Sequence, residues 1–256
     1  MRAPDELRAL VEGALADIDL PTELGGLRES VAYALEGGGK RIRPVLCLAT
    51  AEAAGGTAED ALPAAVALEL VHSFSLVHDD LPALDDDDER RGRPSAHVAF
   101  GEGVALLAGD ALLAEAMRRV LSYPDPDAAR ELAQATLGMI GGQYLDITGA
   151  DDDLAALHRL KTGSLFAASI GCGLWAARVP VAEQAPWRAF GDELGLLFQV
   201  VDDILDGDGY VERLGADEAR ALADEAADRA RARLDAVEAD TTVLLELVNG
   251  LAVRTA

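Results

Sequence analysis

Apolar residues recur at helical spacing along nearly the whole chain, whereas β-branched runs bounded by turn residues are scarce. Ala and Leu, which favour helix, recur throughout, and clusters of Gly, Pro and Asp separate the periodic segments. The pattern predicts helices over residues 3–18, 26–36, 43–54, 58–78, 104–121, 128–145, 153–177, 183–205 and 216–248. We therefore expect an all-α fold.

Two of these segments are apolar around nearly their whole circumference. Residues 64–77 and 194–205 carry few polar positions on any face, so we expect them at the centre of a bundle. Each apolar segment ends in aspartates, since residues 76–85 read LVHDDLPALD and residues 198–206 read FQVVDDILD. No stretch resembles an interdomain linker, and residues 1–256 are expected to form a single domain.

Composition narrows the function classes. A net charge of −24 argues against binding the nucleic acid backbone and makes cations natural partners. Residues 1–20 mix charged with apolar residues, and the longer apolar runs are interrupted by charge or Pro, so we expect neither a signal peptide nor a membrane span. Cys47 and Cys172 lie far apart in apolar surroundings, which favours free thiols in a reducing compartment. We expect a cytoplasmic protein.

The first aspartate cluster follows a predicted helix end. Pro82 removes the amide that would bond to the carbonyl of His78, so the helix must kink or stop there. Asp85 can then return toward Asp79 and Asp80. In the second cluster, Asp202 and Asp206 are four residues apart and share a face. Gln199 lies one turn before Asp202, and Asp203 is rotated away by about 100°.

Carboxylates gathered at the end of a buried helix repel one another unless a cation neutralises them. Oxygen ligands suit Mg²⁺, which usually binds a few carboxylates together with substrate phosphates. Residues 85–89 alone are also consistent with a solvated acidic loop, but two clusters after two apolar helices favour a metal site. A calcium loop of the EF-hand type lacks its Gly and distal Glu here.

Basic residues supply partners for an anion. Residues 37–44 (GGGKRIRP) place three glycines, Lys40 and Arg43 just before a predicted helix, as in a phosphate cradle, although a Gly-rich surface turn is the alternative. Arg90 and Arg91 follow the acidic run, as local charge balance or as phosphate ligands. His72 lies on the first apolar helix, where a hydrogen-bonded core histidine is the alternative. Lys161 lies in an apolar stretch and requires an anion.

Together these segments resemble the trans-isoprenyl diphosphate synthases, which include farnesyl and geranylgeranyl diphosphate synthases. The matches run in family order: residues 38–44, His72, the DDxxxxD motif at 79–85 with Arg90-Arg91-Gly92, residues 141–143 (GGQ), Lys161-Thr162, Gln199 and residues 202–206. Each motif alone is weak, whereas the ordered set is specific.

The resemblance implies an isoprenoid synthase helical bundle around a central cavity, usually as a homodimer. Mg²⁺ would be held against an allylic diphosphate by Asp79, Asp80, Asp85, Asp202, Asp203 and Asp206. Arg90 and Lys161 would contact that diphosphate, whereas Lys40, Arg43, His72 and Arg91 would hold isopentenyl diphosphate. Thr162 and Gln199 would line the reacting centre. The allylic carbon–oxygen bond ionises, the cation alkylates isopentenyl diphosphate, and a proton is lost.

Phe74 bears on product length. It lies five residues before Asp79, about 7.5 Å down the helix from the diphosphate. The resemblance implies that an aromatic ring there acts as a floor for the growing chain, although a plain core aromatic is the alternative. We expect farnesyl diphosphate as the main product and geranylgeranyl diphosphate second.

One departure from the family pattern leaves two alternatives to the synthase function. After the second motif the family carries a longer, lysine-bearing loop, whereas residues 206–210 (DGDGY) pass almost directly into the next helix. A non-catalytic subunit that modulates a related synthase is one alternative, although such a subunit need not keep its metal motifs. A class I terpene cyclase is another, but it would have one Asp-rich motif and no isopentenyl site.

Overall fold

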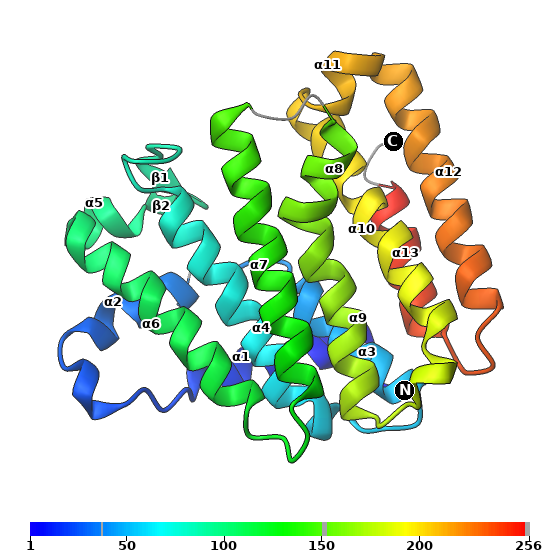
Figure 1. Ribbon diagram of the computed structural model, residues 1–256, viewed down its shortest axis with the longest axis horizontal. Helices are drawn as coiled ribbons and strands as arrows, with labels where there is room; N and C mark the ends of the chain where they lie inside the picture. The colour runs from blue at the N-terminus through cyan, green and yellow to red at the C-terminus, as the bar shows by residue number, and fades with distance from the viewer. Residues whose placement is uncertain (37, 150–152, 254–256) are drawn as a thin grey trace.

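The computed structural model describes residues 1–36, 38–149 and 153–253, and most of them are helical (Figure 1). The predicted all-α fold is confirmed. Its α-helices are α1 (Pro4–Ala16), α2 (Leu27–Glu36), α3 (Ile42–Ala53), α4 (Ala58–Asp79), α5 (Ala96–Phe100), α6 (Glu102–Val120), α7 (Asp127–Thr148), α8 (Leu154–His158), α9 (Ser164–Ala176), α10 (Ala185–Asp206), α11 (Tyr210–Leu214), α12 (Ala216–Asp235) and α13 (Thr242–Ala252).

Short elements complete the chain. They are the 3-10 helices η1 (Thr22–Leu24) and η3 (Val181–Glu183), the π-helical segment η2 (Arg159–Gly163), and an antiparallel hairpin of β1 (Glu89–Arg90) and β2 (Arg93–Pro94). α5, α11 and the hairpin were not predicted, because elements of two to five residues show no recognisable periodicity.

The prediction of one helix over residues 216–248 was wrong. α12 ends at Asp235 and α13 begins at Thr242, with a turn between them. The side chain of Asp240 accepts hydrogen bonds from the backbone amide of Thr242, at 3.1 Å, and from its hydroxyl, at 2.6 Å. An Asp just before an apolar run is a helix-start signal, and this one divides the segment.

α4 lies at the centre of the bundle, in contact with α1, α3, α6 and α9 (Figure 1). The side chain of Thr57 caps its start by accepting a hydrogen bond from the amide of Asp60 at 3.1 Å. By length and composition alone α4 could span a membrane, but 67% of its apolar stretch is buried within the protein. The central placement predicted for this helix is therefore confirmed.

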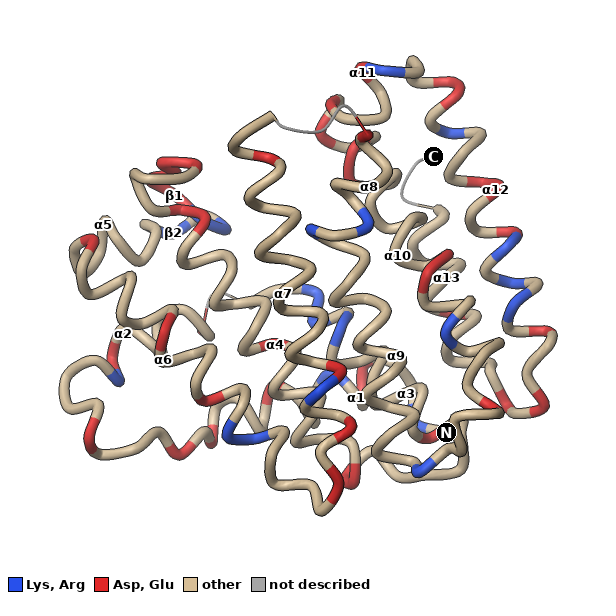
Figure 2. Tube along the Cα trace, in the orientation of Figure 1, with Lys and Arg blue, Asp and Glu red and all other residues tan. Residues whose placement is uncertain are grey.

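α10 is less enclosed than its sequence predicted. It packs against α9, α12 and α13, and the side chains of Leu194, Leu197 and Val201 are buried. Its last turn reaches the surface, since Leu205 is 54% exposed, so the prediction of a wholly central helix was wrong for this end. The carboxyl-terminal ends of α4 and α10 lie at the same end of the bundle (Figure 1). Acidic segments gather there, near the β1–β2 hairpin and in the turn between α10 and α11 (Figure 2).

Candidate active site

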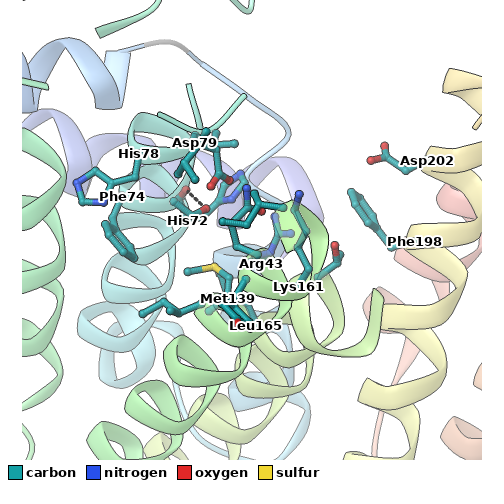
Figure 3. Close-up of a pocket in the computed structure, with 18 residues that line it drawn as sticks. Arg43, His72, Phe74, His78, Asp79, Met139, Lys161, Leu165, Phe198 and Asp202 are labelled. Carbon is teal, nitrogen blue, oxygen red and sulfur yellow. Dashed lines mark hydrogen bonds between the residues drawn. The ribbon is translucent and has the colours of Figure 1, made fainter. Parts of the chain in front are cut away.

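A cavity of about 490 Å³ opens between the ends of α4 and α10. Side chains from α3, α4, α7, η2, α9 and α10 line it. Asp79 and Asp202 lie on opposite sides of the cavity, with Lys161 between them, and Met139 and Leu165 lie below (Figure 3). The cavity is therefore charged at one end and apolar at the other.

The first aspartate cluster folds back on itself, as its sequence predicted. α4 ends at Asp79, and the backbone amide of Asp85 donates a hydrogen bond to the carbonyl of Asp79 at 2.8 Å. Burial, together with the charges of Asp85 and Asp80, raises the pKa of Asp79 to about 6, although Lys161 opposes the shift. The positive charges near Asp79 therefore do not offset the cost of burying its carboxylate. Asp85 itself is exposed to solvent.

Asp80 and Arg90 form an ion pair with each other and do not line the first cavity. Asp80 is 3% exposed, and one of its oxygens accepts a hydrogen bond from Nε of Arg90 at 2.9 Å. Arg90 also binds Asp87 at 2.9 Å. Burial raises the pKa of Asp80, opposed by the hydrogen bond from Arg90. In the described chain, Arg90 is therefore placed as the counter-charge of the first cluster.

The second cluster divides into two parts. Asp202 lines the cavity, and burial and the charge of Asp206 raise its pKa. Asp203 instead points inward: it is 3% exposed, and its oxygens accept hydrogen bonds from Nε2 of Gln199 at 2.6 Å and from the amide of Tyr210 at 2.8 Å. This arrangement leaves Asp202 and the exposed Asp206 as the accessible carboxylates, and it places the amide of Gln199 against Asp203.

The carboxylates of the two clusters suit a divalent cation that is shared with a substrate. Among the described residues, no three His, Cys, Asp or Glu side chains form a ready-made metal site. Asp79 and Asp202 do face one cavity, and burial raises the pKa of each. Oxygen donors short of positive charge fit Mg²⁺, which commonly completes its shell with waters and substrate phosphates.

A second cavity, of about 450 Å³, adjoins the first and is basic. Lys40, Arg43, His72 and Arg91 line it, and Arg43, His72 and Phe198 line both cavities. The sequence therefore grouped these four residues correctly in space. Gly37, the first glycine of the predicted cradle, lies outside the described residues.

Arg43 lies where the two cavities meet. Its guanidinium stacks over the ring of Phe166, 4.7 Å from the centroid, and its Nε has no hydrogen-bond partner within the part of the chain that is described. Burial lowers its pKa to about 10, so the group remains charged at neutral pH. Burial and the neighbouring arginines hold the pKa of His72 well below its usual range, so its ring is neutral.

Lys161 already has an anionic partner within the chain. Its ammonium binds the carboxylate of Asp146 on α7. The close approach of η2 to α7 needs a glycine, since a Cβ on Gly142 would lie 2.3 Å from the backbone nitrogen of Lys161. The sequence indicated an anion beside Lys161 but not that Asp146 supplies it. Thr162, the next residue, lines the first cavity as expected.

Gln143 is a cavity residue to which the sequence assigned no role. It lines the first cavity, and both polar atoms of its buried amide lack a partner among the described residues. The sequence feature that could have indicated a role for Gln143 is the GGQ segment at residues 141–143. Asp146 follows Gln143 one turn later, on the same face of the helix. Phe74 also lines this cavity, and its ring packs edge-on against His78 with centroids 4.8 Å apart (Figure 3).

Comparison with known proteins gives consistent matches. Residues 25–224 match the family model described as polyprenyl synthetase. The chain is 43% identical over 202 residues to a geranylgeranyl diphosphate synthase of Cyanophora paradoxa, covering 73% of this chain and 67% of that protein. It is 37% identical over 213 residues to a farnesyl diphosphate synthase of Bacillus subtilis, covering 77% and 71%. The crystal structure of a geranyltranstransferase from Thermotoga maritima superposes with a TM-score of 0.89 at 29% identity, covering 98% of each chain.

Proposed function

Since this chain belongs to the polyprenyl synthetase family, we propose that it is a short-chain prenyl diphosphate synthase that joins isopentenyl diphosphate to an allylic diphosphate. The observation that carries the proposal is the pair of adjoining cavities. One has carboxylates at one end and an apolar interior, and the other is basic. The pair suits two diphosphates whose hydrocarbon parts must meet.

Each cavity has the chemistry of one substrate. The allylic diphosphate lies between Asp79 and Asp202, with its tail toward Met139 and Phe74. Isopentenyl diphosphate lies against Lys40, Arg43 and Arg91 in the basic cavity. Arginine forks and a lysine are the usual partners of phosphate oxygens.

The residues between the cavities promote ionisation of the allylic carbon–oxygen bond. Lys161 and Arg43 place positive charge near the departing diphosphate. Asp79 and Asp202, with the exposed Asp85 and Asp206, would hold Mg²⁺, which would supply positive charge to the diphosphate oxygens. The carbon–oxygen bond breaks with its electron pair on the departing diphosphate, the allylic carbon bonds to the isopentenyl double bond, and the released diphosphate accepts the proton that is lost. His72, held neutral, adds no positive charge beside the cation.

We propose farnesyl diphosphate as the main product. Phe74 is only 7% exposed and lines the cavity that would take the growing tail. Its ring is braced by His78, whose Nε2 lies 2.9 Å from the carbonyl of Leu106 on α6. A braced ring limits how far a chain extends. Geranylgeranyl diphosphate is the second candidate, because relatives of both kinds match this chain.

We also propose a cytoplasmic homodimer. α6 and α7 expose large apolar side chains, among them Leu107 at 53%, Leu137 at 64% and Tyr144 at 61%. Such a face is suited to a second copy of this chain. Ile140 and Tyr144 both line the first cavity and reach this face, so a partner would shield the apolar interior from water. Light scattering of purified protein measures the oligomeric state directly.

Turnover tests the proposed function. Purified protein with Mg²⁺ and isopentenyl diphosphate is incubated separately with dimethylallyl, geranyl and farnesyl diphosphates, and the products are identified after dephosphorylation. We expect elongated prenyl diphosphates, and we expect EDTA to abolish their formation. A cyclic hydrocarbon made without isopentenyl diphosphate would identify a terpene cyclase. An inert protein that activates a related synthase would identify a modulating subunit.

A further inference from the structure

Arg41 is buried at a strained turn and forms part of the lining of the basic cavity. It is 3% exposed, and its backbone is left-handed, with φ of 46°, where α3 begins. Residues other than glycine adopt this conformation at a cost, and it persists where surrounding contacts fix it. The contacts of the Arg41 side chain therefore determine the shape of the turn.

The guanidinium of Arg41 is anchored at three points. Nε donates to Glu12 of α1 at 2.8 Å, Nη1 donates to Glu69 of α4 at 2.5 Å, and Nη2 donates to the carbonyl of Leu35 in α2 at 2.7 Å. Three helices thus hold one side chain. A rigid fork with fixed donor directions makes this possible, and a lysine could not reproduce it.

The neighbours of Arg41 in the sequence are the groups that line the basic cavity. Lys40 precedes it, and Arg43 follows two residues later. Because the turn passes through Arg41, the position of its side chain fixes where Lys40 and Arg43 can reach. Without the anchor, the protein would keep both positively charged side chains, but they would lie in different positions.

Glu69 has a related role on α4. It is 2% exposed and lies three residues before His72, on the same face of the helix. Within the described structure it is the one acidic residue lining the basic cavity. Its ion pair with Arg41 engages this carboxylate, so Arg43 and Arg91 remain available to an anion.

We propose that Arg41 and Glu69 are positioning residues for isopentenyl diphosphate, a role that rests on the proposed function. Their buried ion pair fixes the turn at residues 39–42, so that Lys40 and Arg43 face the diphosphate. The guanidinium of Arg41 donates to Glu12, Glu69 and the carbonyl of Leu35, so we assign it the positioning of the turn and not the binding of the diphosphate.

Calorimetry with isopentenyl diphosphate alone tests this inference without any turnover. Arg41→Lys and Glu69→Gln are compared with the parent, and we expect each to raise the Kd for isopentenyl diphosphate at least tenfold. In steady-state assays the KM for isopentenyl diphosphate rises similarly, while the allylic KM and kcat change less than threefold. The Arg41→Ala protein should bind isopentenyl diphosphate more weakly than the Arg41→Lys protein does, because lysine can keep one of the ion pairs.

A second ion pair in the chain supplies the matched control. Arg188, near the start of α10, binds Glu131 with two hydrogen bonds of 2.9 Å each, far along the helix from Asp202. Glu131→Gln removes a more exposed arginine–carboxylate pair and should lower the melting temperature while leaving the Kd unchanged. If the Arg41 variants do not fold, Glu12→Ala, which removes only the half-exposed anchor, should show a smaller but still selective rise in Kd.

The outcomes separate the two claims. Folded Arg41→Lys and Glu69→Gln proteins with the parent's Kd would overturn the positioning role and leave a purely structural ion pair. A rise in both KM values by the same factor would overturn it as well. A parent protein that binds no isopentenyl diphosphate would overturn the proposed function itself, and this inference with it.

Discussion

The carboxylate of Asp79 lies where its charge is unfavourable. Burial raises its pKa from 3.8 to about 6, so the folded state holds this proton more tightly than the unfolded chain does. Stability from this group is therefore fully present below about pH 4 and is lost as the pH rises through about 6. A cation at this site would restore what the metal-free protein loses.

Asp79→Asn should accordingly stabilise the metal-free protein at pH 7.5. We expect about 1–2 kcal/mol, allowing for solvent screening, which is several degrees in Tm. At pH 4.5 the gain should largely disappear, because the parent's carboxyl is then protonated. Thermal unfolding in EDTA at both pH values measures the effect, with Asp224→Asn on the exposed face of α12 as the control. A gain of equal size at both pH values would show that charge is not its cause.

Phe74 is the residue on which product length depends. Ideal helix geometry turns it about 140° from Asp79, so sequence alone did not establish that both face one space. Both line the first cavity. Phe74→Ala should therefore shift the products to twenty carbons or more and leave ionisation largely intact.

Chromatography of the dephosphorylated products measures this shift. Phe100→Ala is the matched control, since that ring packs edge-on against Tyr33 and does not line the first cavity. An unchanged product distribution from a folded, active Phe74→Ala protein would mean that another residue forms the floor.

The resemblance grouped Asp79 with Asp202, and both line one cavity, but it did not give the partners that other residues have across helices. Rotation of about 100° per residue correctly set Asp203 apart from Asp202. It could not show that Asp203 accepts a hydrogen bond from the backbone amide of Tyr210, because that contact depends on the path of the following turn. In the same way, the partner of Lys161 is on α7, and the partners of Arg41 are on α1, α2 and α4. Such pairs depend on how helices pack, which no local pattern contains.

The turn between α10 and α11 is the element that departs most from the family pattern. Only residues 207–209 separate the helices. The side chain of Asp203 stabilises the turn by accepting a hydrogen bond from the backbone amide of Tyr210. A Cβ on Gly209 would lie 2.2 Å from an oxygen of Asp203, so the turn is packed closely against α10. The lysine that the family places here is absent from residues 206–210.

A longer, lysine-bearing loop grafted between α10 and α11 should lower the KM for the allylic substrate. The reason is one added charge-assisted contact, worth about 1.5–3 kcal/mol, and a better enclosed site. Steady-state kinetics compare this graft with a graft of equal length that has serines in place of the lysines. If both grafts leave KM unchanged, the short turn does not limit substrate retention.

Elements differed in how well their sequences predicted them. Long helices such as α4 and α7 were predicted to within a few residues. The division of residues 216–248 was missed because α12 and α13 both continue a helical pattern, and the break depends on one cap at Asp240. The hairpin β1–β2 has two residues per strand and leaves no alternation to detect.

At the scale of the whole molecule, an acidic protein contains a basic cavity. The net charge is −24, yet Lys40, Arg43 and Arg91 converge beside α4. The acidic residues near the carboxyl-terminal ends of α4 and α10 lie at the same end of the bundle (Figure 2). This division of charge is the basis of the account, since one substrate would be bound through cations on carboxylates and the other directly by basic side chains.

A crystal structure of the complex tests that division most directly. The protein would be crystallised with Mg²⁺, isopentenyl diphosphate and an allylic analogue in which sulfur replaces the bridging oxygen, so that it does not ionise. We expect the allylic diphosphate between Asp79 and Asp202 with its tail toward Phe74, and isopentenyl diphosphate against Lys40, Arg43 and Arg91. Isopentenyl diphosphate bound at the carboxylates, or a basic cavity that stays without diphosphate at saturating ligand, would contradict it.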